Sequence, residues 1–425
     1  MESSIETLIR REVDRRFPEQ VDFVKELVRF PSTRGNEAAA QEFMASEYRD
    51  RGLTVDHWQI DIEDIRDQPG FSPVHVSYDN AFNVVGTSLP ESNRGRSLIL
   101  NGHIDVVPTG PVDMWTRPPF DPVVDGAWMY GRGAGDMKAG LSVPVFALDA
   151  LRGAGVRPAA PVHVQSVIEE ECTGNGALAC LRRGYRADAA LIAEPQGGKV
   201  IGAQVGVIWF QVTIYGKPVH ARETGRGVNA IEAAIPMIRA LHDLEARWNA
   251  PDRRHPAFAR HDHPINLNIG RIEGGDWASS VPAWCTVDVR IGIFPDRSIK
   301  EACQEVEACI QGALRGNGSS DAPPPKISFH GFLAEGYVLT NAESPLAVLG
   351  RAHRTVEGTD LEQRLSTATT DARFFGLYAG IPALVYGPRA EEIHGFDERV
   401  DLESLRRCTQ VAALFIADWC ALEPV

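Results

Sequence analysis

Short apolar runs alternate with longer amphipathic stretches over much of the chain. The runs are rich in Val, Ile and Leu and too short for typical helices, so they predict buried strands at residues 83–89, 97–100, 162–168, 189–193 and 382–386. The longer stretches predict helices at residues 21–29, 38–51, 137–152 and 402–420. Strands that alternate with helices are typical of an α/β fold with a mostly parallel sheet.

The pattern changes between about residues 206 and 332. Here the expected order is strand, helix, strand, strand, helix, strand, which is the ferredoxin-like βαββαβ order. The elements are expected at residues 207–215, 229–248, 265–272, 284–293, 299–314 and 327–332, and a proline-rich loop at residues 317–325 precedes the last strand. The α/β pattern resumes near residue 340, so the sequence predicts a discontinuous domain of residues 1–205 and 333–425 with residues 206–332 inserted into it.

Length and composition restrict the class of protein. The chain has 425 residues, enough for two domains, and its formal net charge of -14 argues against a nucleic-acid or anionic-membrane partner and favours a small-molecule substrate. Its first thirty residues lack the apolar core of a signal peptide or membrane span. The seven cysteines include no CxxC pair, so we expect reduced cysteines and a cytoplasmic location.

A histidine and an aspartate directly follow the predicted strand at residues 97–100, in Asn-Gly-His103-Ile-Asp105. Ligands of α/β sheets usually bind at the carboxyl ends of the strands. A metal-bound imidazole commonly has its second nitrogen held by a carboxylate, and Asp105 is spaced to hold His103 in this way. As an isolated pair, these residues also fit a purely structural role.

Glycines surround Asp136 in the segment Gly-Arg-Gly-Ala-Gly-Asp136-Met-Lys138-Ala-Gly. The segment is not a phosphate-binding loop, because no Ser or Thr follows Lys138, and it lacks the third glycine of a dinucleotide loop. The glycines let the backbone pack closely around a carboxylate at a loop-to-helix junction. Asp136 is therefore a candidate metal-bridging ligand or a helix cap.

Three glutamates, Glu169, Glu170 and Glu171, follow the apolar strand predicted at residues 162–168, and a glycine turn comes next. Adjacent glutamates at the end of a buried strand repel each other unless they share a cation. An acidic run is usually a solvated surface, but such surfaces seldom follow a buried strand directly. Because neighbouring side chains point to opposite sides, one glutamate could bind a metal while the one before it stands over a bound water.

Two further candidate ligands lie near the ends of predicted strands: Glu194 in Ala-Glu-Pro and His394 in Glu-Ile-His-Gly-Phe-Asp-Glu. Each of them alone is ambiguous. Together with His103, Asp136 and one glutamate of the acidic run, they make two histidines and three carboxylates. Such a nitrogen and oxygen set suits a paired zinc site with room for water.

With these motifs, the chain resembles the zinc-dependent amidohydrolases and exopeptidases related to acetylornithine deacetylase, succinyl-diaminopimelate desuccinylase, glutamate carboxypeptidase and aminoacylase. His-Ile-Asp-Val-Val-Pro, the glycine-rich segment, the Glu-Glu pair, Ala-Glu-Pro and the late His-x-x-Asp-Glu occur in the family's order. The resemblance covers nearly the entire chain. It implies a zinc-exopeptidase-like catalytic domain and an inserted lid and dimerisation domain.

The resemblance also implies a cofactor of two divalent metal ions. Zinc is the expected metal, and the ligand set also accepts cobalt or manganese. The ligands implied are Asp136 as the bridge, His103 and Glu194 for one ion, and Glu171 and His394 for the other.

The remaining roles follow in the same way. Counting back from the glycine turn makes Glu170 the general base, which takes a proton from water and delivers it to the leaving amine. His220, in Lys-Pro-Val-His220-Ala, matches a histidine that enters the active site from the partner subunit of a homodimer. Arg290 matches a lid arginine that binds a substrate carboxylate, and Thr369 matches a substrate-contacting loop.

These roles predict hydrolysis of the amide bond in a small N-acyl amino acid or related N-acyl amine, as in the acetylornithine deacetylase branch. Relatives usually carry Asn before Val-Val-Pro where this chain has Ser279-Ser280-Val281-Pro282, and Arg389 replaces the second glycine of a Gly-Pro-Gly motif. Both changes concern the expected substrate and leave the ligand set whole. The alternatives are a dipeptidase or carboxypeptidase on the same metals, and a non-catalytic ligand-binding relative.

Overall fold

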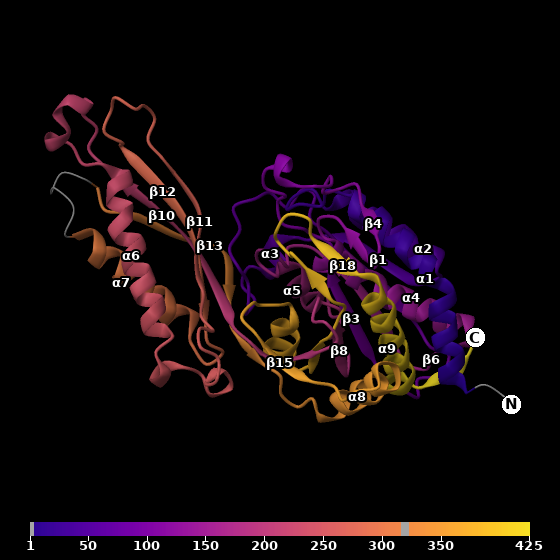
Figure 1. Cartoon of the computed structure of the whole chain (residues 1–425). Helices are drawn as coiled ribbons and strands as arrows, with labels where there is room; N and C mark the ends of the chain where they lie inside the picture. The colour runs from indigo at the N-terminus through magenta and orange to yellow at the C-terminus, as the bar shows by residue number, and fades with distance from the viewer. Residues whose placement is uncertain (1–3, 316–322) are drawn as a thin grey trace.

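The computed structural model describes residues 4–315 and 323–425, so most of the proline-rich loop predicted at residues 317–325 lies outside the described residues. The chain forms a larger body built from both of its ends and a smaller, elongated body built from its middle (Figure 1). Each body has a hydrophobic core of its own. Among the described residues, no helix combines the length and the apolar character that crossing a membrane requires.

A six-stranded sheet forms the centre of the larger body. Five of its strands were predicted and are confirmed: β2 (Phe82–Ser88), β3 (Leu98–His103), β7 (Val162–Val167), β8 (Ala189–Ile192) and β16 (Ala383–Val385). The strand order is β1-β2-β7-β3-β8-β16, and only β2 runs against the other strands of this sheet. The expected α/β fold with a mostly parallel sheet is thus confirmed.

Strand β1 (Thr54–Gln59) was not predicted. It lies at the edge of the sheet and pairs with β2 alone. Its side chains are half-buried or exposed, so it has no continuous apolar run that would mark it in the sequence. Such a pattern is expected of an edge strand, which packs against the core less completely than a central one.

Helices cover the sheet. Those of the main group pack against one another: α1 (Ile5–Arg29), α4 (Ala139–Gly153), α8 (Glu343–Glu357) and α9 (Leu402–Cys420). The predicted helix at residues 21–29 was too short, because α1 begins at Ile5 and buries Ile9 and Val13 one turn apart on the same face. The other helices of this body are α2 (Ala38–Asp50), α3 (Ile62–Ile65) and α5 (Asn175–Arg182).

Three small sheets complete the larger body. One consists of β14 (Tyr337–Val338), β9 (Val200–Gln204) and β15 (Gln363–Ser366). A second pairs β19 (Leu422–Pro424) with β6 (Val156–Pro158). The third has the order β17-β18-β5-β4, with strands β17 (Ala390–Glu391), β18 (Arg399–Asp401), β5 (Trp128–Tyr130) and β4 (Val123–Asp125).

The smaller body has the expected ferredoxin-like βαββαβ order. Its elements are β10 (Gly206–Tyr215), α6 (Ala230–Trp248), β11 (Leu267–Gly274), β12 (Trp284–Ile293), α7 (Ile299–Arg315) and β13 (Lys326–Ala334). The strands form an antiparallel sheet of order β11-β12-β10-β13. Helices α6 and α7 lie on the face of this sheet that points away from the larger body, so the other face looks towards it (Figure 1).

Candidate active site

The five predicted metal ligands converge at one edge of the central sheet. His103 is the last residue of β3, and Glu171 and Glu194 follow the neighbouring parallel strands β7 and β8. Asp136 lies in the turn Ala134–Lys138 that leads into α4. His394 lies on the loop between β17 and β18.

One half of this cluster surrounds His103, which is fully buried. Its Nε2 lies 3.1 Å from Asp136 Oδ1 and 3.5 Å from Glu194 Oε1. Glu170 Oε2 is 3.9 Å from the same nitrogen. Three carboxylates therefore face one imidazole nitrogen in the interior of the protein.

The other half surrounds His394, whose side chain is largely exposed. Its Nε2 lies 3.1 Å from Glu171 Oε2 and 3.6 Å from Asp136 Oδ2. Asp136 thus directs one carboxylate oxygen towards each histidine. This is the geometry needed from a carboxylate that is shared between two cations.

Asp136 is held in place by a residue that sequence reasoning did not single out. Glu398 Oε1 accepts hydrogen bonds from the backbone N–H groups of Gly135 and Asp136, at 2.9 and 3.0 Å. Its other oxygen pairs with Arg132, and both side chains are almost completely buried. The late Asp-Glu of the sequence motif was the available signal, but only the fold shows that its glutamate fixes the Asp136 backbone.

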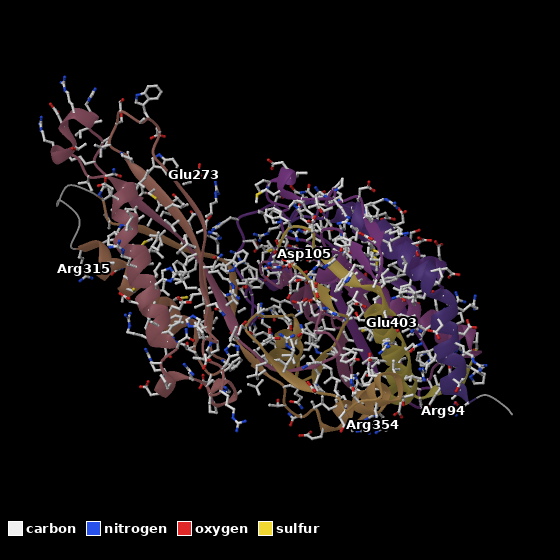
Figure 2. The ribbon with its side chains drawn as sticks, viewed as in Figure 1. Arg94, Asp105, Glu273, Arg315, Arg354 and Glu403 are labelled. Atoms are coloured by element: carbon white, nitrogen blue, oxygen red, sulfur yellow. The ribbon has the colours of Figure 1, made fainter. Side chains whose placement is uncertain are left out.

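Asp105 lies in the interior of the larger body, on the side that faces the smaller one (Figure 2). Its backbone carbonyl, 2.9 Å from His103 Nδ1, makes the short contact to the imidazole, and its carboxylate is 3.6 Å from that nitrogen. The carboxylate instead accepts hydrogen bonds from the backbone N–H groups of Glu170 and Glu171, at 3.2 and 3.1 Å. Asp105 therefore connects the first histidine to the glutamate segment, a contact that the spacing of two residues did not predict.

The side chain of Glu169 also holds the glutamate segment in place. Its carboxylate accepts hydrogen bonds from Arg34 Nε at 2.6 Å, Tyr78 Oη at 2.5 Å and Thr173 Oγ1 at 2.7 Å. The backbone of Glu169 is left-handed, with φ of 63°, a conformation that is unusual for a residue other than glycine. The three bonds hold this turn, and with it the side chains of Glu170 and Glu171.

The carboxylates of the cluster are electrostatically unfavourable without a cation. Burial and the neighbouring Asp136 raise the pKa of Glu194 well above its ordinary value. Burial, together with Glu194, also raises the pKa of Glu170 well above its ordinary value, although the nearby His103 opposes this. Burial likewise disfavours the charge of Asp136, but hydrogen bonds from His103 and His394 outweigh it and lower the pKa of that carboxyl.

These residues fit a pair of divalent cations. Candidate ligand atoms of His103, Asp136 and Glu171 lie within 4.8 Å of one another, and so do those of His103, Glu170 and Glu194. Two imidazoles and several carboxylates are the nitrogen and oxygen donors that zinc and similar metals take. A cation would also compensate the buried negative charges, which are otherwise costly.

A cavity of about 340 Å³ lies between the metal-ligand cluster and the smaller body. Arg290 and Thr369, both singled out in the sequence, line it together with Glu170 and His394. His220 does not line this cavity. It lies in an exposed loop of the smaller body, where its Nδ1 accepts a hydrogen bond from the backbone N–H of Arg222.

Sequence reasoning missed three polar residues of the cavity wall, which are Asn268, Asp288 and His330. They lie on three different strands of the smaller sheet. The alternation of buried and less buried residues along β12 was a signal that one face is free, but which face meets the metal ligands depends on how the two bodies pack.

Comparison with known proteins agrees with this geometry. The model of a family described as peptidase family M20/M25/M40 matches residues 99–418. N-formyl-4-amino-5-aminomethyl-2-methylpyrimidine deformylase of Halalkalibacterium halodurans is 28% identical over an aligned length of 443 residues. The alignment covers 99% of this chain and 98% of that protein. Succinyl-diaminopimelate desuccinylase of Thioalkalivibrio sulfidiphilus is 25% identical over an aligned length of 408 residues, which covers 92% of this chain and 96% of that protein.

Solved structures share the fold. Human carnosine dipeptidase 1 superposes with a TM-score of 0.78 at 16% identity, covering 99% of this chain and 100% of that chain. A dinuclear metal binding peptidase of the M20 family from Bacillus subtilis has a TM-score of 0.59 at 17% identity, with coverage of 96% and 99%. The family resemblance and the amide-hydrolase class expected from the sequence are confirmed. The chain belongs to peptidase family M20/M25/M40 and is a metal-dependent hydrolase of amide bonds.

Proposed function

We propose that this enzyme removes the acyl group from the N-acyl derivative of a small amine, at a centre that holds two divalent metal ions. The observation that carries the proposal is Asp136, whose two oxygens face His103 and His394 at 3.1 and 3.6 Å. Deacylation is supported by the two relatives named above, a deformylase and a desuccinylase that match nearly the whole chain.

The proposed ligand set has two halves that share Asp136. His103 and Glu194 would hold one ion, and Glu171 and His394 the other. Zinc fits this mixture of imidazole and carboxylate, and cobalt or manganese would also be accepted. When bound, the two ions would polarise the amide carbonyl and make a water molecule more acidic.

Glu170 is the proposed general base. It is buried, and its Oε2 lies 3.9 Å from Nε2 of His103, so its carboxylate is placed to exchange a proton with a water molecule at the metal-ligand cluster. Its carboxylate takes the proton of the attacking water and then delivers it to the nitrogen of the leaving amine. The hydrogen bonds of Glu169 and Asp105 keep the Glu170 segment in place during both transfers.

Arg290 and Thr369 are proposed to bind the substrate, because both line the cavity next to Glu170. Arg290 is held by the backbone carbonyls of Asn266 and Thr367, each at 3.4 Å. Its guanidinium can donate hydrogen bonds to an acceptor of the substrate.

We also propose a homodimer that forms through residues 206–332. The edge strand β11 and helix α6 expose apolar side chains, namely Ile272 at 53%, Ile235 at 48% and Ile231 at 37% of their surface. An exposed sheet edge with apolar neighbours favours pairing with a second chain. In such a dimer the exposed His220 would enter the partner's active site and stabilise the oxyanion.

A reducing, cytoplasmic setting is part of the proposal. All seven cysteines are free thiols in the structure. Proteins of oxidising compartments commonly pair their cysteines, whereas cytoplasmic proteins keep them reduced.

Metal analysis combined with an amide panel tests the proposed reaction. We expect close to two equivalents of metal per chain and turnover of N-formyl, N-acetyl or N-succinyl amines. Glu170→Gln should retain the metal and lower kcat by about a hundredfold to ten-thousandfold, as for loss of a general base. Turnover of dipeptides alone would support the peptidase alternative, and an active Glu170→Gln enzyme would contradict the assigned base.

Subunit mixing tests the role of His220. His220→Ala and Glu170→Gln should each have strongly reduced activity as pure proteins. A mixed dimer contains one site with an intact Glu170 and an intact His220 from the other chain, so mixing should restore activity. If activity does not return although mixed dimers form, His220 does not act across the interface.

A further inference from the structure

The smaller sheet presents one of its faces to the metal-ligand cluster. Along β12, Val287 and Val289 are buried with the core of the smaller body, whereas Asp288 and Arg290 belong to the opposite face. That face looks towards the larger body (Figure 1). The cavity of about 340 Å³ lies between it and Glu170, so this sheet face contacts whatever part of the substrate extends beyond the amide.

Aromatic rings make up much of this wall. Trp209, His330 and Phe332 line the cavity, and Trp209 pairs with Arg290 on the same sheet face. The rings of Trp209 and Phe332 lie edge to face, with centroids 5.2 Å apart and an angle of 88° between them. His330 packs in turn against His75 of the larger body at 5.0 Å. Such rings favour a flat, apolar ligand group over a flexible chain.

The wall also carries a hydrogen-bond acceptor and a donor two residues apart on one face of β12. Asp288 Oδ1 accepts a hydrogen bond from Gln211 Nε2 at 2.7 Å, which fixes the orientation of the carboxylate. Arg290, two residues further along the same face, donates to the backbone carbonyls of Asn266 and Thr367, each at 3.4 Å. A carboxylate and a guanidinium that line the same cavity can together accept from a donor group and donate to an acceptor group of one ligand.

We propose that the amine half of the substrate is a flat heteroaromatic ring that carries an amino group next to a ring nitrogen, as an aminopyrimidine does. The amino group donates to Asp288, the ring nitrogen accepts from Arg290, and the ring packs against Trp209 and Phe332. The inference rests on the proposed deacylase function and makes it more specific. An acyclic diamino acid could also pair with Asp288 and Arg290, but it would leave the aromatic wall without a matching surface.

The test compares amines that all carry the same formyl group, so that only the amine half differs. The three substrates are the N-formyl derivatives of 4-amino-5-aminomethyl-2-methylpyrimidine, benzylamine and ornithine. We expect the highest kcat/KM for the pyrimidine, by about tenfold or more over benzylamine, because benzylamine lacks the donor and acceptor that Asp288 and Arg290 would meet.

Asp288→Asn should lower kcat/KM about tenfold or more for the pyrimidine and much less for benzylamine. Only the pyrimidine has an amino group that would lose its hydrogen bond to the charged carboxylate of Asp288. Thr286→Ala is the matched control. Thr286 lies on the same face of β12, bonds to Thr213 and does not line the cavity, so this change should leave the ranking of the three substrates unaltered.

A binding experiment separates this inference from the proposed reaction. Calorimetry should show that the free aminomethylpyrimidine binds Glu170→Gln, and that adding Asp288→Asn or Trp209→Leu weakens the binding about tenfold. If the enzyme hydrolyses none of the amides but these binding differences are found, the proposed reaction is wrong and the assigned pocket stands. If formyl-ornithine is the best substrate, or Asp288→Asn affects all three equally, the aminopyrimidine inference is overturned while deacylation stands.

Discussion

The two halves of the proposed metal centre are built in different ways. His103 ends a central strand and is fully buried, whereas the side chain of His394 is 53% exposed and lies on a loop. The backbone of His394 is also left-handed, with φ of 63°. One half is therefore fixed by the sheet, and the other depends on the contacts of a single loop.

This difference has a functional meaning. A ligand on a buried strand loses little further conformational freedom when a metal binds, so the His103 half is preorganised. The loop half is open to solvent and borders the substrate cavity through His394. We infer that a metal ion exchanges more readily at the His394 half.

Removing the buried histidine should have the largest effect. His103→Ala leaves Asp136, Glu170 and Glu194 without their shared imidazole, so the buried carboxylates repel each other and metal binding there is lost. We expect kcat/KM to fall by at least about a thousandfold, because a metal supplies several kcal/mol of transition-state stabilisation. Metal analysis should find one equivalent fewer, and excess metal should not restore activity.

Removing the exposed histidine should have a smaller and partly reversible effect. In His394→Ala, Glu171 and Asp136 remain as ligands, and water can take the vacant position. We expect kcat/KM to fall by about a hundredfold at low metal concentration, and to recover in part when metal is added, as mass action requires. Equal and irreversible losses in the two variants would contradict the proposed difference between the halves.

The connection between the halves is tested through Asp105. In Asp105→Asn an amide nitrogen replaces one of the oxygens that accept the N–H groups of Glu170 and Glu171. We expect metal affinity to fall by about tenfold, as is usual for residues that orient metal ligands. A thermal melt distinguishes this from general unfolding, and unchanged metal affinity would show that the glutamate segment is held by Glu169 alone.

The sequence predicts the buried half of the site better than the loop half. The strands that end near His103, Glu171 and Glu194 are apolar runs, and parallel neighbours bring their carboxyl ends to one edge. His394 has no such context, because β17 and β18 are only two and three residues long. It was identified through the family motif.

The residues that orient the ligands could not be derived in the same way. Glu398 and Asp136 are far apart in sequence, and their contact depends on the packing of β18 against β5. Asp105 was expected to hold His103 with its carboxylate, but its carbonyl makes that short contact. That Asp288 lines the cavity follows only from the orientation of the whole smaller sheet. Each of these features comes from tertiary packing, which hydrophobic periodicity does not encode.

The smallest effect should come from loosening the loop that carries His394. Asp397, three residues further on, accepts hydrogen bonds from the backbone N–H and the Oγ1 of Thr116, both at 2.9 Å. Arg132 donates to the carbonyl of Gly395 at 3.0 Å. These contacts tie the loop to the segment before β4 and to the buried Arg132, so they should determine how well His394 is preorganised.

Thr116→Val removes only the side-chain hydrogen bond and keeps the size of the residue. The loss of about 1 kcal/mol corresponds to roughly fivefold weaker metal binding. If the halves are independent, titration of the metal-free protein should show this loss for one metal equivalent and none for the other. Thr286→Ala, which changes a residue outside the cavity, is the silent control. If both equivalents bind more weakly, the two halves are not independent. Asp136, which faces both histidines, would then transmit the change in the loop to the buried half.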